Sequence, residues 1–174
     1  MIIGLTASAQ TFKHDGIWYN VIGTEEVAVA KPGNNEFYEG SVEIPLSIDY
    51  QGRTYSVTKI AAAAFAESDN LDSGIHKLTS VTMADNITSI EEGAFQNCVN
   101  LQSAKISNRT TYVGVNAFAD CRNMTSLTLS RYLEEIRDGA FLNCEKVGQV
   151  ALYDRLKKIG NQSFAGCKSL SSID

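Results

Sequence analysis

The chain has 174 residues, of which 44% are hydrophobic and 20% charged, a composition that suits a globular domain with a sizeable core. The formal net charge is −5 and no run of Lys and Arg occurs, so the sequence does not favour binding to nucleic acid. No apolar stretch reaches the roughly 18 residues needed to cross a bilayer, so we expect no transmembrane segment.

The first nine residues resemble the end of a secretion signal. Apolar residues dominate the first five positions, and Ala7-Ser8-Ala9 has the small residues of a signal-peptidase site ahead of Gln10. The basic start and the longer apolar core of a complete signal are not present. We interpret residues 1–9 as the remnant of an export signal, and a disordered or strand-forming terminus is the alternative.

Residues 10–57 do not repeat, and their pattern predicts β-hairpins. Residues 17–22 and 26–30 are rich in apolar and aromatic side chains around a turn containing Gly23. Residues 46–50 and 54–57 form a similar pair around Gly52. A strong turn signal, Lys31-Pro32-Gly33-Asn34-Asn35, lies between the two predicted hairpins.

From residue 58 onward the chain repeats, and its regular part, Ile87 to Asp174, has a constant 23-residue period. A fixed period of roughly 20–29 residues is typical of leucine-rich repeats stacked as a solenoid. The strongest columns are Ile90, Val113, Ile136 and Ile159; Phe95, Phe118, Phe141 and Phe164; and Cys98, Cys121, Cys144 and Cys167.

Each coil can be interpreted physically. Residues 124–129 have the L-x-x-L-x-L pattern of a short strand, and residues 133–136 predict a second extended piece. Residues 137–144 predict a helical turn whose Phe fills the interior. The predicted fold is a leucine-rich-repeat solenoid, a right-handed coil with parallel strands on one face and short strands and helical turns on the other.

About five coils are expected in residues 58–174. The first is irregular, because the interval from Phe65 to Phe95 is longer than the regular one and a loop-like insertion lies around Ser68 to Lys77. A coil exposes its apolar face unless a neighbour covers it, so residues 10–57 are interpreted as an N-terminal β-hairpin cap. No such cap follows the last coil, so we expect further sequence after Asp174.

The four Cys occupy one column of the repeat, which favours a ladder of buried thiols that behave as small hydrophobic side chains. A bridge between adjacent coils stays open as an alternative, whereas metal binding is disfavoured because no C-x-x-C or Cys/His pair occurs. His14 and His76 stand in no catalytic pattern. We therefore expect no catalytic residues, cofactor or metal.

The strand face and the turn that follows each strand are the candidate binding surfaces. Outward strand positions are mostly short and polar, and the turns carry Tyr and Arg, which dominate binding energy at interfaces. A solvated face with stem-packed side chains would explain the same residues. The candidate partner-binding residues are Lys105, Arg109, Tyr112, Thr128, Arg131, Tyr132, Tyr153 and Arg155.

The repeated columns resemble the BspA-like leucine-rich repeats of bacterial secreted and cell-surface proteins. The resemblance implies export and an extracellular or surface location, no catalysis, and binding to a protein or glycan partner such as host extracellular matrix. A proline common after the strand in that family is missing here. The resemblance is carried by "ITSIEEGAFQNCVNLQSAKI", "TYVGVNAFADCRNMTSLTL", "LEEIRDGAFLNCEKVGQVAL" and "LKKIGNQSFAGCKSLSSI".

Three functions follow as hypotheses. The first is a recognition or adhesion module that binds through its solenoid surface, and the second is a structural spacer that displays another domain. The third, an enzyme, is the least favoured because no set of acid, base, nucleophile and metal ligands can be assembled.

Overall fold

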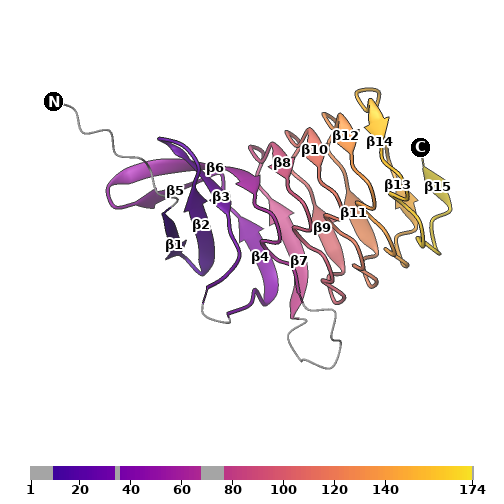
Figure 1. Ribbon diagram of the computed structural model, residues 1–174, viewed down its shortest axis with the longest axis horizontal. Helices are drawn as coiled ribbons and strands as arrows, with labels where there is room; N and C mark the ends of the chain where they lie inside the picture. The colour runs from indigo at the N-terminus through magenta and orange to yellow at the C-terminus, as the bar shows by residue number, and fades with distance from the viewer. Residues whose placement is uncertain (1–9, 34–35, 68–76, 174) are drawn as a thin grey trace.

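The structure is a computed structural model that describes residues 10–33, 36–67 and 77–173. It is an elongated stack of coils, and the chain advances along the long axis from the N-terminal strands to the C-terminal ones (Figure 1). Three of the sequence predictions concern residues outside this described part: the secretion remnant at 1–9, part of the predicted turn at 34–35, and the insertion at 68–76.

The N-terminal part is built of paired strands. β1 pairs antiparallel with β2 and β2 with β3, so the predicted pairing across Gly23 is confirmed. β5 pairs antiparallel with β6, which confirms the pairing across Gly52. These strands are β1 (Thr11–His14), β2 (Ile17–Val21), β3 (Glu26–Val29), β4 (Gly40–Ile44), β5 (Ser47–Tyr50) and β6 (Arg53–Ile60).

Two of these strands continue the sheets of the repeat, which the sequence pattern did not indicate. β3 lies parallel to β6 and β4 lies parallel to β7, so β3 and β4 are arranged like the two strands of a coil. The centroid of the Tyr38 ring lies 4.3 Å from that of Phe65, where a coil would place its own Phe. β6 crosses the expected boundary after residue 57 because it serves both as a hairpin strand and as the first strand of the next coil.

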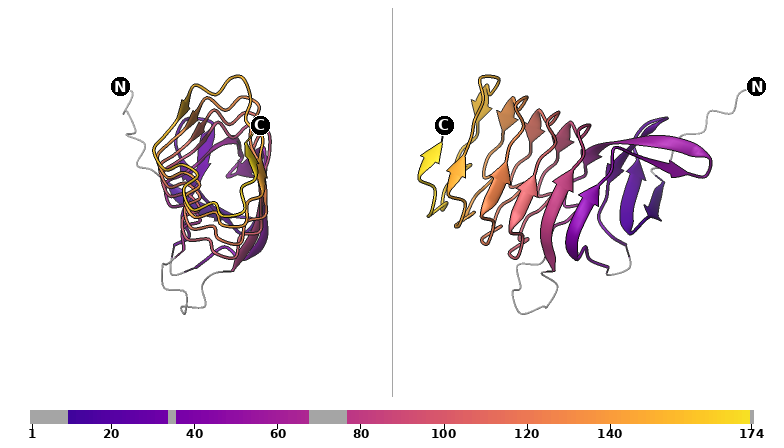
Figure 2. Two further views of the ribbon diagram at one scale, coloured as in Figure 1. Left: turned by 90° about the vertical axis from the view of Figure 1, so that its right-hand side faces the viewer. Right: turned by 180° about the vertical axis from the view of Figure 1, so that it is seen from behind.

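Each coil of the repeat contributes short strands that pair in parallel with the equivalent strands of the neighbouring coils, as Val113 does with Ile136. Seen end-on, the coils lie over one another (Figure 2). The strands of the described residues form sheets of nine, four and two strands. Those of the repeat are β7 (Leu78–Met83), β8 (Ser89–Ile90), β9 (Ser103–Lys105), β10 (Tyr112–Val113), β11 (Ser126–Thr128), β12 (Glu135–Ile136), β13 (Gln149–Val150), β14 (Lys158–Ile159) and β15 (Ser172–Ile173).

The Phe side chains form a continuous stack through the interior. The ring centroids of Phe95 and Phe118 are 4.7 Å apart, those of Phe118 and Phe141 are 5.4 Å apart, and the planes are nearly parallel. Phe65 extends the stack on one side and Phe164 on the other. The three central rings are completely buried. The shared interior predicted from the period is confirmed.

The segment around each Phe forms a series of turns, in which alternate N–H groups have different partners. The N–H of Phe95 donates to the carbonyl of Ala117 in the next coil at 2.7 Å, whereas the N–H of Cys98 donates to the carbonyl of Phe95 at 3.2 Å. Phe118 repeats the bond to the next coil, at Ala140. A helix needs these N–H groups for its own carbonyls. The expected helical turn is therefore not formed at these residues.

Candidate functional site

Most of the candidate binding residues lie on one set of turns. We call the turns that follow β9, β11 and β13, residues 106–111, 129–134 and 152–157, the turn edge. They are equivalent in successive coils, so a residue on one turn lies beside the residues at the same position of the coils before and after it. The turn edge therefore collects surface side chains from three coils.

A serine fixes the shape of the first two turns. The Oγ of Ser107 accepts from the N–H of Arg109 at 3.2 Å, and the Oγ of Ser130 accepts from the N–H of Tyr132 at 3.0 Å. Ser130 also donates to the carbonyl of Asn108 in the preceding coil at 2.8 Å. A hydroxyl that bonds the backbone two residues on stabilises a tight turn. These bonds give Arg109 and Tyr132 equivalent backbone positions.

Arg109, Tyr132 and Arg155 follow one another at the interval of the repeat and form a single column along the turn edge. The guanidinium carbon of Arg155 lies 4.8 Å from the centroid of the Tyr132 ring, which is a cation–π contact. Tyr132 is 47% exposed, so the stacked pair lies at the surface. The column presents alternating cationic and aromatic groups to solvent.

A shallow hollow lies beside this column. Leu129 is buried and gives it an apolar wall, whereas Tyr153 is 38% exposed. Asn108 and Leu129 were not predicted from the sequence, although Asn108 shares a column of the repeat with Arg131 and could have been found from it. The lining residues are Asn108, Thr128, Leu129, Arg131, Tyr132 and Tyr153, four of which are predicted candidates.

The other candidates are distributed differently. Lys105 on β9 pairs in register with Thr128 on β11, so it lies next to the hollow. Tyr112 is the first residue of β10, and its neighbours in register are Ser89 and Glu135 in the nine-stranded sheet. Tyr112 does not line the hollow, because the chain has already entered the other sheet at that position.

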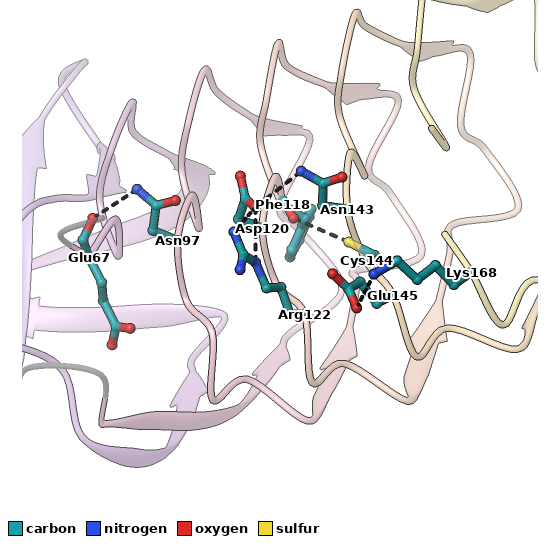
Figure 3. A network of polar contacts seen from close by, with 9 residues as sticks. All are labelled: Glu67, Asn97, Phe118, Asp120, Arg122, Asn143, Cys144, Glu145 and Lys168. Atoms are coloured by element: carbon teal, nitrogen blue, oxygen red, sulfur yellow. Dashed lines mark hydrogen bonds and ion pairs between the residues drawn. The ribbon is translucent and has the colours of Figure 1, made fainter. Parts of the chain in front are cut away.

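The turns on the opposite edge of the coils carry charged side chains that pair with one another (Figure 3). The Oδ1 of Asp120 accepts from Arg122 at 2.9 Å and from the side-chain amide of Asn143 in the next coil at 3.2 Å. Lys168 lies 2.9 Å from Glu145. The hydrogen bonds and ion pairs of these groups are made within the protein, so this edge is a weaker candidate for binding a partner.

The four Cys are free thiols, and Cys98, Cys121 and Cys144 are buried. The Sγ of Cys121 donates to the carbonyl of Phe95 in the preceding coil at 3.2 Å, and the other three Cys make the equivalent bond. Burial raises the pKa of all four thiols. The predicted ladder of buried thiols is confirmed for these three residues, whereas Cys167 is half-buried.

Some of the other titratable groups form pairs at the surface. The Nε2 of His14 lies 3.4 Å from Asp15, and His76 is outside the described residues. Glu134 pairs with Lys157 at 2.7 Å, which lowers the pKa of Glu134. Within residues 10–33, 36–67 and 77–173, no three His, Cys, Asp or Glu side chains are grouped to hold a metal ion.

The stacked coils, the parallel strands and the repeated interior define a leucine-rich-repeat solenoid. A family model described as BspA type leucine rich repeat region matches residues 73–174 in six copies. The chain belongs to this family, as its columns predict. No helix in the described part of the chain is both long and apolar enough to cross a membrane.

Several solved structures share the fold. A leucine-rich repeat protein from Bacteroides ovatus is 28% identical, with a TM-score of 0.80 over 94% of this chain and 40% of that one. The T. pallidum leucine rich repeat protein TpLRR is 22% identical, with a TM-score of 0.72 over 86% of this chain and 63% of that one. A leucine rich cell surface protein from Faecalibacterium prausnitzii is 20% identical, with a TM-score of 0.53 over 95% of this chain and 54% of that one. This chain therefore spans less than two thirds of each of these proteins, and no curated protein matches its sequence.

Proposed function

We propose that the chain is an extracellular recognition module that binds a protein or glycan partner through the turn edge. Its family consists of bacterial surface proteins whose repeats support binding or display rather than catalysis. A similar structure is described as a cell surface protein, which supports an extracellular location. The observation that carries the proposal is the column of Arg109, Tyr132 and Arg155 beside an apolar-walled hollow. Exposed Tyr and Arg at a concave site are the residues that most often anchor a partner.

A capping role for residues 10–57 is part of this proposal. β3 and β4 pair with β6 and β7, and the ring of Tyr38 covers the N-terminal side of Phe65. The Tyr38 hydroxyl donates to the carbonyl of Ala30 at 2.8 Å, so this buried polar group is satisfied. A cap of this kind stabilises the first coil and leaves the turn edge of the later coils accessible.

The test is a binding screen of the 174-residue chain against immobilised extracellular matrix proteins and glycans. Each partner found is then measured with a variant that carries Tyr132→Ala, Tyr153→Ala and Arg155→Ala. We expect these truncations together to weaken binding by about 2–4 kcal/mol, since the side chains are exposed anchors. Tyr112→Ala is the matched control, because that Tyr lies on the other sheet.

Unchanged affinity of the triple variant would show that the partner binds elsewhere. The alternative function is a structural spacer that displays another domain of a larger surface protein. It predicts that the isolated chain binds none of the screened molecules, so the same screen separates the two functions.

A further inference from the structure

The turn edge and the strand beside it carry basic side chains without acidic partners. Lys105, Arg109, Arg131 and Arg155 are all exposed. Among the residues that the structure describes, no carboxylate lies within ion-pair distance of any of the four. They extend over three successive coils, so together they form a local positive surface.

Some basic side chains elsewhere on the chain are paired with carboxylates. The formal net charge is −5, so acidic side chains are in excess overall. On the opposite edge Arg122 pairs with Asp120, and on the nine-stranded sheet Arg137 pairs with Glu135, each at 2.9 Å. On the turn edge Lys157 pairs with Glu134, whereas Arg109, Arg131 and Arg155 form no ion pair with any described residue and can bind an external anion.

Acidic groups near this surface neutralise it only in part. Glu134 lies on the same turn as Tyr132; its carboxylate binds Lys157 at 2.7 Å and also interacts electrostatically with Arg155, beyond ion-pair distance. Asp85 accepts from the backbone N–H of Asn108 at 3.1 Å. Asp154 is exposed next to Arg155 and limits the local charge without pairing with it. The balance of unpaired groups on the turn edge is therefore positive.

The geometry of the column leaves the cationic donors accessible. A guanidinium stacked on a ring keeps the N–H groups in its plane free to donate, and this plane matches the two oxygens of a carboxylate. The guanidinium carbon of Arg155 lies over the Tyr132 ring, 4.8 Å from its centroid. Fixing the side chain before binding lowers the entropy lost when a partner is bound.

Apolar surface lies beside these donors. Leu129 forms a buried wall of the hollow, and the exposed rings of Tyr132 and Tyr153 form its sides. An acidic polypeptide can offer a carboxylate and an apolar side chain within a few residues. Acidic polysaccharides carry the charge but no apolar side chain, so the combination favours a peptide.

We propose that the turn edge binds an extended acidic peptide segment, whose carboxylates pair with Arg131 and Arg155 and whose apolar side chain enters the hollow. This inference rests on the proposed function and adds the chemistry of the partner. Arg109 and Lys105 extend the cationic surface on the N-terminal side of the hollow. Recognition of acidic segments by clusters of Arg is a recurrent mode of peptide binding.

The probe is a fluorescein-labelled peptide with three Glu-Phe-Asp-Gly units, measured by fluorescence anisotropy with the full 174-residue chain. A peptide with Lys in place of Glu and Asp is the charge control, and a heparin oligosaccharide is the polysaccharide control. We expect the acidic peptide to bind, and added salt to weaken binding because the charges lie at the surface.

Two charge reversals test the site. Arg155→Glu should weaken binding of the acidic peptide by about tenfold or more, the value of one lost charged hydrogen bond plus repulsion. Arg53→Glu makes the same change in net charge on the β5–β6 hairpin, away from the turn edge, and should leave affinity nearly unchanged. Urea unfolding of both variants shows whether the folded state is retained.

The proposal is overturned if the acidic peptide does not bind, if both reversals weaken it equally, or if heparin binds at the turn edge and the peptide does not. The proposed function is still supported after any of these results if the triple alanine variant no longer binds a partner found in the screen. If that variant binds its partner normally, the proposed function fails with it.

Discussion

At the scale of the residue, two positions in each regular coil hold the backbone at positive φ. L-residues pay about 1–2 kcal/mol in this region, and Gly, Asn and Asp adopt it most readily. A residue at such a position must also leave room for the neighbouring coil, because its Cβ can clash with the backbone there. The two columns are Gly93, Asn116, Gly139 and Gln162, and Asn97, Asp120, Asn143 and Gly166.

Gly114 provides a test of close contact between coils that is free of backbone strain. A Cβ at Gly114 would lie 2.7 Å from backbone atoms of Glu91 and Glu92, whereas a Cβ at Gly148 would meet nothing within 4 Å, and neither Gly has a positive φ. We expect Gly114→Ala to lower the free energy of unfolding by about 1–3 kcal/mol, because the backbone must move. Urea denaturation measures it, with Gly148→Ala as the control. Equal effects of the two variants would contradict the contact.

The buried thiols predict a dependence of stability on pH. Burial raises the pKa of Cys121 well above its ordinary value of 9.0, and the neighbouring thiols of Cys98 and Cys144 add to this shift. Above pH 9.0 the unfolded chain loses this proton while the folded chain keeps it, so the free energy of unfolding falls as pH rises. Below this pH the contribution is fully present.

Cys121→Ala should therefore make the alkaline decline shallower by up to about 1.4 kcal/mol per pH unit, the value for one proton. Urea denaturation of both proteins from about pH 8 to about pH 10.5 measures the difference in slope. Parallel curves would mean that the thiol ionises alike in the folded and unfolded chains. The variant also removes a buried side chain, so the slope is the informative quantity rather than the stability at one pH.

At the scale of the element, the coil is stabilised by its neighbours rather than by its own hydrogen bonds. The N–H groups of Phe118 and Asp120 donate to carbonyls of the next coil, and the ring of Phe118 lies between those of Phe95 and Phe141. Local bonds alternate with bonds between coils, so a single coil could not keep this conformation by itself.

Phe118→Ala should lower the free energy of unfolding by about 3–5 kcal/mol, because it removes a completely buried ring and opens a cavity between two others. Phe164→Ala is the comparison at the half-buried end of the stack and should cost less. Chemical denaturation gives both values. A larger loss of unfolding free energy for Phe164→Ala would show that the contribution of a ring to stability does not depend on how deeply it is buried.

At the scale of the whole molecule, burial falls toward the last coils. Val113 and Ile136 are completely buried in the middle of the stack, whereas Ile159 and Ile173 are 49% and 47% exposed. In a solenoid the stability of a coil depends on the neighbours on either side. Local opening is therefore expected to be easiest in the last coils of this 174-residue chain.

Hydrogen exchange at two equivalent amides tests this gradient. The N–H of Gly114 donates to Ile90 and that of Gly160 donates to Ile136, both at 2.8 Å, so the two bonds have the same length. We expect the amide of Gly160 to exchange faster, because the coil that carries it is less buried. Exchange measured by NMR gives the rates. Equal protection would indicate that the stack opens only as one unit.

The sequence alone determined the solenoid, its parallel strands, the stack of Phe rings and the family, because a constant interval between like residues places equivalent side chains over one another. It also predicted two antiparallel strand pairs of the N-terminal part, β2 with β3 and β5 with β6, and most residues of the hollow. These features depend on local periodicity and on residue type, which the sequence contains directly.

The tertiary structure decided what depends on contacts between coils. It replaced the expected helical turn with turns bonded to the next coil, and it placed Tyr38 on the Phe stack through a coil-like arrangement of β3 and β4. It also separated Tyr112 from the hollow and left Arg131 and Arg155 without an ion pair to any described carboxylate. These outcomes depend on which backbone and side-chain atoms of neighbouring coils come into contact. The spacing of residues along the sequence does not specify the distances between those atoms.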